Sequence, residues 1–533
     1  MIKNIKWLLI ASISLVACNE DEPAVVVEAP ATAGSANFTK YVSLGNSLTA
    51  GFSDNALFKR GQENAYPVIL SKQFAQVGGG AFKVPFMNDN TGGLLFGGAP
   101  APNVPNVPVL NGGVLQFAPR LYLAGFFNAT TPNITNVSPQ GTQTTEASTV
   151  LTGPFNNMGV PGAKSFHLLA AGYGSSFGNP YFRRFASSPS TTMLADAVAQ
   201  NPTFFSLWIG NNDVLSYATS GGIGVNQLTN PNPATYGGND ITNTGTFASV
   251  IGTIVDGMTA GGAKGVLGNI PYVTSIPFFT TVPTNPLTTL TEAQTTPLNA
   301  SIFGPLDAIL TGLGQPDRFV ALFPNDNNPA TTKDANPVVI IDETLTDYSA
   351  QITAALIANM VPAPQAGLMG NLYGRARHAR NTAGSRDYIL LTTRGIIGTP
   401  QPGVPAPFNT RGVTYPLQDA AVLTADETLQ IKTAVDAFNI AIKAKADAKG
   451  LAFVDLNAVL AQVASPAGFR YGNFQVTSAF ITGGAFSLDG VHPSARGQAL
   501  IANKFLEAIN AKYGSTLKMV NIGDYQTQYP LSL

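Results

Sequence analysis

Cysteine, histidine and charged residues are all scarce in this chain. Its 533 residues include one cysteine and three histidines, and only 11% of them are charged. A single cysteine excludes a disulfide within the chain, and three scattered histidines form no metal-ligand cluster, so we expect neither a metal nor another cofactor. The net charge of −1 gives no electrostatic basis for binding nucleic acid. The low content of charged residues mildly favours an apolar binding partner. Part of it, however, reflects Thr, Asn and Gly at surface positions where other proteins have charged residues.

The N-terminus has the layout of a secretory signal. Lys3 and Lys6 precede an apolar run from Trp7 to Ala17, which is too short to span a bilayer. The end of this run and the next residue read Leu-Val-Ala-Cys, which resembles a bacterial lipobox. In a lipobox the cysteine, here Cys18, is lipidated after removal of the preceding residues, here 1–17. An ordinary signal peptide with a leftover thiol is the alternative. The only cysteine of the chain stands where the lipobox requires one, which favours lipidation.

The segment after Cys18 is suited to a membrane-anchored protein. Residues 19–22, Asn-Glu-Asp-Glu, are similar to surface-export signals on lipoproteins of the Bacteroidetes group, although acidic residues also solvate any linker. Residues 18–37 are rich in Ala, Val and Pro and predict a flexible tether. No second stretch is apolar and long enough for a transmembrane helix. We therefore expect an outer-membrane lipoprotein, with exposure at the cell surface as one arrangement.

Four separated segments combine residue types that carry hydrolytic chemistry. A serine hydroxyl becomes a nucleophile when an imidazole takes its proton and a carboxylate orients that imidazole. Asp489 and His492 are three residues apart, so one turn can bring them together, and Ser47 follows an apolar strand-like run near the front of the chain. The segments are Gly45-Asn46-Ser47-Leu48, Asn157 to Ala163, Gly210-Asn211-Asn212-Asp213 and Asp489 to Pro493.

In these four segments, and in their order, the chain resembles the GDSL lipases and esterases, also called SGNH hydrolases. The resemblance extends from about residue 38 to about residue 510 and implies Ser47 as nucleophile, His492 as general base and Asp489 as its orienting acid. It further implies an oxyanion hole made of the Ser47 and Gly162 backbone N–H groups and the Asn212 amide. The first segment reads Gly-Asn-Ser where the family has Gly-Asp-Ser, so we expect altered local hydrogen bonding at residue 46.

Each segment alone has a more ordinary explanation. Ser47 alone is typical of a turn, and residues 211–213 alone predict the cap of a helix starting near Val214. His167 follows Gly162 in an apolar, helix-like stretch and is interpreted as a structural histidine, either packed or facing solvent. His378 lies in a run with three arginines, which is typical of a solvated loop or helix face. Only the four segments together favour catalysis.

The resemblance implies an α/β fold, namely an SGNH-hydrolase-like (flavodoxin-like) three-layer architecture with a central parallel sheet and large loop insertions. Patterning predicts helices over 246–259, from the capping box at 424–427, and over 495–510, with strands over 264–271 and 451–456. We expect one domain over 38–515. Its insertions, near 76–152, 219–244, 278–300 and 395–420, are rich in Gly, Pro, Asn and Thr, which predicts loops or small β excursions without a second core. The tail, 516–533, packs as a strand or hangs free.

Three functions are compatible with the sequence. The first is a lipid-anchored serine esterase or lipase that acts, as a monomer, on a lipid-like carboxylic ester through an acyl-Ser47 intermediate. The second is a carbohydrate esterase that deacetylates a surface polysaccharide. The third is a surface binding protein on a hydrolase scaffold, which the complete set of Ser47, Gly162, Asn212, Asp489 and His492 disfavours. No metal site and no nucleic-acid partner are expected.

Overall fold

The computed structural model describes residues 30–100, 117–127, 132–137, 142–328 and 335–533. The signal segment, Cys18 and the first part of the predicted tether lie outside these residues. Among the described residues, no helix has the length and apolar character needed to cross a membrane.

A five-stranded parallel sheet forms the centre of the protein. Its spatial order is β15-β8-β7-β1-β6. If these five strands are renumbered 1 to 5 in chain order, the order from the β6 edge is 2-1-3-4-5. All residues of β1 and β7 are buried, as expected for a parallel strand covered on both faces. The strands are β1 (Tyr41–Gly45), β6 (Asn157–Gly159), β7 (Phe204–Trp208), β8 (Lys264–Gly268) and β15 (Ala452–Val454).

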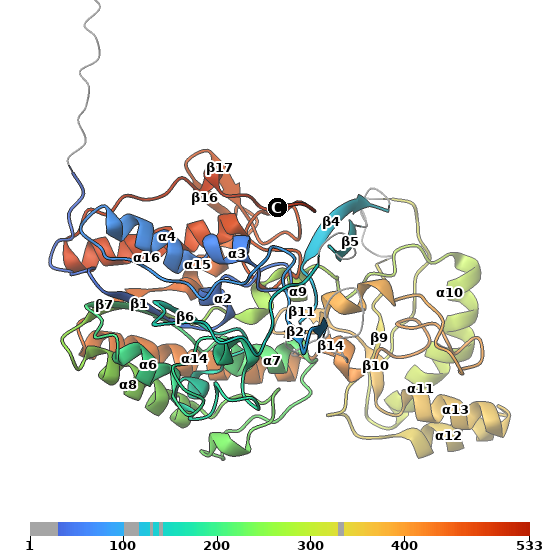
Figure 1. Ribbon diagram of the computed structural model, residues 1–533. Helices are drawn as coiled ribbons and strands as arrows, with labels where there is room; N and C mark the ends of the chain where they lie inside the picture. The colour runs from blue at the N-terminus through green and yellow to red at the C-terminus, as the bar shows by residue number, and fades with distance from the viewer. Residues whose placement is uncertain (1–29, 101–116, 128–131, 138–141, 329–334) are drawn as a thin grey trace, which may run out of the picture.

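Helices cover both faces of this sheet (Figure 1). One hydrophobic cluster joins alternate strand residues such as Phe205 to α6, α8 and α14, and a second joins Phe204 to α4, α15 and α16. Successive side chains of a strand point to opposite faces, which is why neighbouring phenylalanines enter different clusters. The helices are α4 (Tyr66–Ala75), α6 (Met193–Val198), α8 (Thr244–Thr259), α14 (Ala425–Ala448), α15 (Leu456–Val463) and α16 (Ala495–Tyr513).

Local sequence signals located these elements well. The predicted helix over 246–259 is α8, the capping box at Thr424 and Glu427 opens α14, and the closing helix is α16. In the capping box, Glu427 Oε2 accepts the Thr424 N–H at 2.7 Å. Smaller helices near the site are α2 (Ser47–Ala50), α3 (Lys59–Glu63), α5 (Pro180–Arg183) and α7 (Asn212–Thr219).

Residues 277–423, here called the accessory subdomain, contain hydrophobic cores of their own. One cluster packs α11, α12 and α13 against β9 and β10, and another contains Val282, Leu287, Val413 and Leu417. The expectation that the insertions near 278–300 and 395–420 hold no second core is therefore wrong. Figure 1 shows this subdomain beside the main sheet. Its elements are α9 (Pro277–Thr280), α10 (Glu292–Leu298), α11 (Gly304–Gly312), β9 (Val339–Ile341), α12 (Ser349–Ala358), α13 (Ala363–Tyr373), β10 (Ala376–His378), β11 (Asn381–Thr382), β12 (Ser385–Arg386), β13 (Tyr388–Ile389) and β14 (Val422–Leu423).

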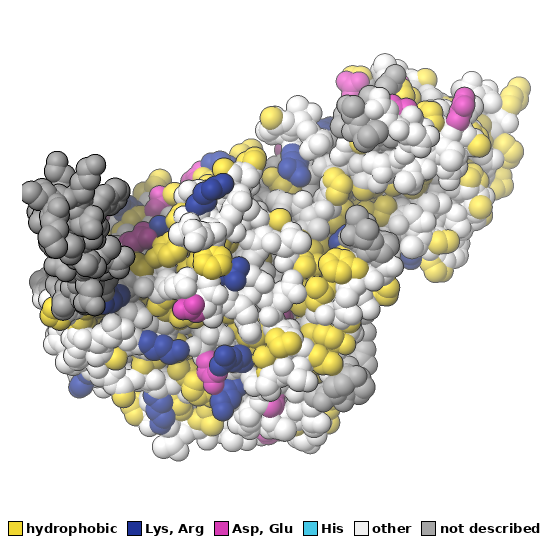
Figure 2. All heavy atoms as spheres, turned by 90° about the horizontal axis from the view of Figure 1, so that it is seen from above, with side chains coloured by type: hydrophobic (Ala, Val, Ile, Leu, Met, Phe, Trp, Pro, Cys, Tyr) yellow, Lys and Arg dark blue, Asp and Glu magenta, His cyan; other side chains and the backbone are white. Residues whose placement is uncertain are grey.

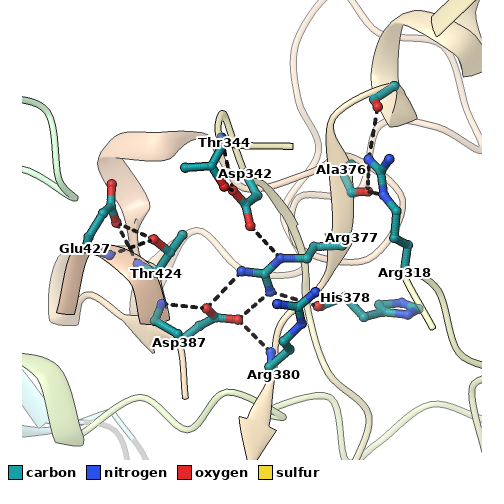
Figure 3. Close-up of polar contacts among 12 residues, drawn as sticks. Arg318, Asp342, Thr344, Ala376, Arg377, His378, Arg380, Asp387, Thr424 and Glu427 are labelled. Carbon is teal, nitrogen blue, oxygen red and sulfur yellow. Dashed lines mark hydrogen bonds and ion pairs between the residues drawn. The ribbon is translucent and has the colours of Figure 1, made fainter. Parts of the chain in front are cut away.

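A buried ion network ties the accessory subdomain to α14 (Figure 3). Arg377 is 1% exposed, and its guanidinium donates to Asp342 at 2.7 Å and to Asp387 at 2.6 Å. Asp387 also accepts the Ala425 N–H at 3.1 Å, at the first turn of α14. A buried charge is stable only when it is paired and hydrogen-bonded, and each member of this network satisfies another.

The other insertions match the expectation of loops and small β excursions. Within the described part of 76–152, β2 (Leu95–Phe96) pairs with β3 (Ala99–Pro100), and β4 (Leu121–Phe126) pairs with β5 (Pro132–Asn136). Between α7 and α8, residues 220–243 contain one short 3-10 turn, Pro233–Thr235, and an isolated bridge between Asn226 and Ile241. A last hairpin pairs β16 (Phe469–Tyr471) with β17 (Phe474–Val476).

Both ends of the described part of the chain are attached to the main body. The tail neither forms a strand nor hangs free, because Leu517, Ile522 and Tyr529 are buried. The predicted tether ends earlier than residue 37, since the Thr32 carbonyl accepts the Thr516 N–H at 3.0 Å and the Ser35 N–H donates to Tyr513 at 2.8 Å. On the face that Figure 2 shows, acidic and basic side chains are few and lie scattered among uncharged ones.

Candidate active site

The four sequence segments meet at the carboxyl ends of the central strands. Gly45 at the end of β1 is level with Gly159 of β6 and Trp208 of β7, so the loops after these three strands open at one edge. The strand order reverses direction beside β1, and open parallel sheets bind ligands in the crevice at such a switch point. The fold therefore collects the candidate residues where a ligand site is expected.

Asn46 holds the turn that presents Ser47. Its Oδ1 accepts the Leu48 N–H at 3.0 Å and caps the four-residue helix α2, which Ser47 opens. Its Nδ2 donates to Asn211 Oδ1 at 3.4 Å, and the side chain is fully buried. This second bond requires a donor at residue 46, which an aspartate carboxylate lacks. The departure from the Gly-Asp-Ser pattern thus has a local partner in Asn211.

Ser47, His492 and Asp489 form a hydrogen-bonded chain. His492 Nε2 lies 2.9 Å from Ser47 Oγ, and His492 Nδ1 lies 2.8 Å from Asp489 Oδ2. The ring of Phe52 packs on the imidazole with a centroid distance of 4.7 Å, and the Phe52 N–H donates to the Ser47 carbonyl at 3.0 Å. Residues 445 positions apart are thereby brought into the order serine, histidine and aspartate, the arrangement that a catalytic triad requires.

The Asp489 carboxylate is buried and densely hydrogen-bonded. Its Oδ1 accepts the N–H groups of Val491 and His492, both at 2.8 Å, and the Ser487 hydroxyl at 3.0 Å. Its Oδ2 also accepts the Asn55 N–H at 3.0 Å. Burial alone raises the pKa of Asp489, but the His492 imidazole and the N–H donors outweigh it and hold that pKa below the ordinary value. Asp489 is therefore an anion at neutral pH.

Gly162 occupies the turn that follows β6. The Ala163 N–H donates to the Val160 carbonyl at 3.1 Å, and Pro161 and Gly162 occupy the central positions, with Gly162 at φ +79°. This is a type II turn, whose third residue needs the left-handed conformation that glycine adopts freely. Asn212 Nδ2 donates to the Ala163 carbonyl at 3.0 Å, so the two predicted oxyanion donors belong to one bonded unit.

Asp213 supports this unit and was not singled out by the sequence. It accepts the Ser165 N–H at 2.8 Å and the Ser165 hydroxyl at 2.6 Å, which fixes the segment just after Gly162. Burial raises the pKa of Asp213, whereas its bonds to Ser165 and the nearby Lys164 ammonium lower it. Residues 211–213 also begin α7, which starts at Asn212, but Asn211 makes no side-chain capping hydrogen bond, so the helix start is confirmed and the predicted cap is not.

The two remaining histidines lie apart from the triad and are packed. His167 forms part of the 3-10 turn Ser165–Leu169 and stacks on Tyr173 at 4.4 Å, and burial lowers its pKa to about 4. The expectation of a solvated surface for His378 is wrong. It is 5% exposed in β10 between the rings of Phe303 and Phe319, and burial lowers its pKa to about 3. Both imidazoles are neutral at pH 7.

A largely apolar cleft of about 110 Å³ opens beside the triad. Ser47, His492, Asn46 and Asn212 supply its polar end. The remainder is lined by hydrophobic residues of α15 and α16 and of the segment leading into the accessory subdomain, including Val273, Ile276, Val459, Leu460, Val463, Leu500 and Ile501. None of the described residues of the insertion near 76–152 lines this cleft, and Leu94 of that insertion packs in the main hydrophobic core instead.

One group of carboxylates lies away from this cleft. Glu343, Asp419 and Glu427 each place a carboxylate oxygen within 4.8 Å of the others. The sequence patterns did not predict this grouping, because they concerned histidine and cysteine ligands. Burial and, to a smaller extent, neighbouring Glu343 together raise the pKa of Asp419 to about 7. Burial likewise raises the pKa of Glu427. Carboxyls with raised pKa values can share protons, which relieves their mutual repulsion.

No protein-family model matches the chain, and no curated protein or solved structure matches it.

Proposed function

We propose that the protein is a serine hydrolase that cleaves carboxylic esters, with an architecture of the SGNH (flavodoxin-like) kind. The observation that carries the proposal is the bonded chain from Ser47 through His492 to Asp489, placed at the mouth of an apolar cleft. The 2-1-3-4-5 strand order, shared with flavodoxin-like sheets, supports the architecture, because it places the cleft at the switch point.

Proton transfer follows from the hydrogen-bond directions. The Asp489 carboxylate can only accept, so it selects the imidazole tautomer with the proton on Nδ1 and leaves Nε2 as the base facing Ser47 Oγ. When Ser47 Oγ attacks the ester carbonyl carbon, Nε2 takes the hydroxyl proton and later gives it to the leaving alcohol. Water then attacks the acyl-Ser47 ester by the reverse proton path.

The negative charge of the tetrahedral intermediate needs fixed donors. The Ser47 and Gly162 N–H groups have no acceptor in the part of the chain that the structure describes, and Asn212 Nδ2 has a second N–H besides the one bound to Ala163. Removal of one such donor typically costs about 10²–10³ in turnover. Asn212→Ala should therefore lower kcat by that order, with little change in KM.

The cleft lining favours an ester with an apolar acyl group. Aliphatic side chains of α15 and α16 continue from the triad without a charged residue, and each buried CH₂ of a bound chain contributes about 0.8 kcal/mol. An acetyl group would leave most of this surface unused. We infer that the acyl chain lies along α15 and that the alcohol leaves toward solvent.

A chain-length series of p-nitrophenyl esters, from acetate to palmitate, tests the proposal on enzyme that starts after Cys18. We expect turnover to exceed that of acetate for longer acyl chains and to vanish in Ser47→Ala. A maximum at acetate would instead favour a carbohydrate deacetylase. Turnover that is absent, or that survives Ser47→Ala, would favour a binding protein on a hydrolase scaffold.

A substitution in the cleft separates acyl binding from general esterase activity. Leu460→Trp fills the cleft from α15 and should shift the optimum to shorter chains while acetate turnover stays within about threefold. Ala458→Trp, at an exposed position of the same helix, is the matched control and should leave the chain-length profile unchanged. Equal profiles for both variants would refute the acyl slot.

We also propose that Cys18 carries a lipid that anchors the enzyme to the outer membrane. The lipobox resemblance supports this, and Cys18 itself lies outside the described residues. Cys18→Ser should move the protein from the membrane fraction to the soluble fraction without loss of esterase activity. Retention of the variant in washed membranes would refute the anchor.

A further inference from the structure

A turn at residues 53–56, just after α2, contacts the segment that carries Asp489. Asp54 and Asn55 are its central residues, and both have positive φ, 50° and 64°. Ser53 and Ala56 bridge at its ends through two backbone hydrogen bonds of 3.0 Å. Asp and Asn are among the non-glycine residues that adopt this left-handed conformation most readily, and contacts to the Asp489 segment hold the turn in place.

Those contacts lead to the triad. The Asp54 N–H donates to Ser487 Oγ at 3.0 Å, and Ser487 Oγ donates to Asp489 Oδ1 at 3.0 Å. Asp54 Oδ1 accepts the Leu488 N–H at 2.9 Å, and the Asn55 N–H donates to Asp489 Oδ2 at 3.0 Å. The Asp54 side chain therefore binds the residue just before Asp489, while its backbone and that of Asn55 reach both carboxylate oxygens.

Asp54 is also unusual in its own environment. It is 1% exposed, and its Oδ2 has no hydrogen-bond partner among the described residues. The charged or titratable groups around it are Asp489 on the segment it binds, the Arg120 guanidinium next to β4, and Tyr529 in the tail. An unpaired buried carboxylate is costly, whereas a neutral carboxyl in the same place is far less so.

We propose that Asp54 is a positioning residue of the triad, which in its neutral form holds the Ser487–Asp489 segment and when ionised repels Asp489 and loosens it. The proposal rests on the proposed function, since it concerns how the same triad is held. Asp54 touches none of the reacting atoms; it acts through Ser487, Leu488 and Asp489.

The titration of Asp54 places this effect near neutral pH. Burial raises the pKa of Asp54 to about 7; the Leu488 N–H opposes the rise, Asp489 adds to it, and Arg120 opposes it. Below this pH the carboxyl is neutral and Asp489 is the only anion of the pair. Above it, a second negative charge appears beside Asp489 without a partner for Oδ2. Activity should therefore decline as Asp54 ionises.

The test compares Asp54→Asn and Asp54→Ala with the wild type. Asparagine keeps an oxygen acceptor for Leu488, tolerates the left-handed conformation and never ionises, whereas alanine removes the acceptor at every pH. The readout is the second-order rate constant for labelling of Ser47 by a fluorophosphonate probe between about pH 6 and about pH 9. Asp419→Asn, in the accessory subdomain, is the matched control, because burial also raises the pKa of Asp419 to about 7.

We expect Asp54→Asn to match the wild type at about pH 6 and to exceed it at least about threefold at about pH 9. Asp54→Ala should be slower throughout, and Asp419→Asn should follow the wild type. A ratio of Asp54→Asn to wild type that is constant with pH overturns the positioning role while leaving the hydrolase intact. A wild-type enzyme that does not react at Ser47 overturns the proposed function and this inference together.

Discussion

Asp489→Asn is the sharpest test of the triad, because the surroundings of Asp489 dictate how the new amide must sit. Oδ1 of the native carboxylate faces three donors, the N–H groups of Val491 and His492 and the Ser487 hydroxyl. The amide oxygen of the variant is therefore held on this side. Its NH₂ group then faces His492 Nδ1 and the Asn55 N–H.

Two consequences can be given magnitudes. The Asn55 N–H loses its acceptor and meets another donor, which should lower the free energy of unfolding by about 1–3 kcal/mol. The imidazole must accept at Nδ1 and so carries its proton on Nε2, facing Ser47 Oγ, where it cannot act as a base. The wrong tautomer costs about 10⁴ in kcat in an enzyme with such a triad, equivalent to about 5.5 kcal/mol in the barrier.

The assay is pre-steady-state hydrolysis of a p-nitrophenyl ester, with thermal unfolding measured on the same samples. Asp489→Asn should lose the acylation burst by about four orders of magnitude in rate while remaining folded. Ser487→Ala is the control, because it removes one bond to the same carboxylate but keeps the anion, and it should cost less than about tenfold. An Asp489→Asn enzyme within about tenfold of the wild type would show that the anion does not orient His492.

Three further results are expected. Arg377→Met leaves two buried carboxylates unpaired and should lower the free energy of unfolding by about 3–5 kcal/mol in denaturant titration, and a loss below about 1 kcal/mol would contradict the role of the network. Asn46→Asp replaces a hydrogen-bond donor with an anion beside Asn211 Oδ1. It should lower the melting temperature more at pH 7 than at pH 4, where the protonated carboxyl can donate again. Equal decreases at both pH values would argue against the bond between residues 46 and 211. For Asp54, the pKa is about 7 in the folded protein against 3.8 in the unfolded chain, so ionisation costs folding stability as pH rises from about 4 to about 7, by at most roughly 4 kcal/mol. The stability gain of Asp54→Asn should grow over that range and then level off, and a gain independent of pH would refute the assigned titration.

Local sequence patterns predicted the scaffold of the site because they report on local physics. Apolar runs such as 264–271 and the capping box at Thr424 specify their own backbone. The resemblance to the SGNH hydrolases, carried by the order of the four segments, implied that Ser47, Gly162 and Asn212 lie near each other. Asp489 and His492 needed only one turn.

Burial and long-range partnership could not be predicted in the same way. The arginines and histidine at 375–380 have the composition of a solvated surface, yet Arg377 and His378 are buried, because two distant aspartates and two aromatic rings close around them. The core of the accessory subdomain was not predicted for a related reason. Its apolar residues come from stretches that are rich in turn-forming residues and therefore have the composition of loops.

The sequence by itself determined the chemical groups of the site, their order along the chain and the strands and helices that carry them, because these depend on neighbours in the chain. Only the tertiary structure decided which groups hold Asp489 and His492 in place and what shape the neighbouring cleft has. Asp54 and Leu488 are 434 positions apart, and the cleft is assembled from helices and loops of separate segments. Such contacts arise from packing across the whole fold, so no local pattern encodes them.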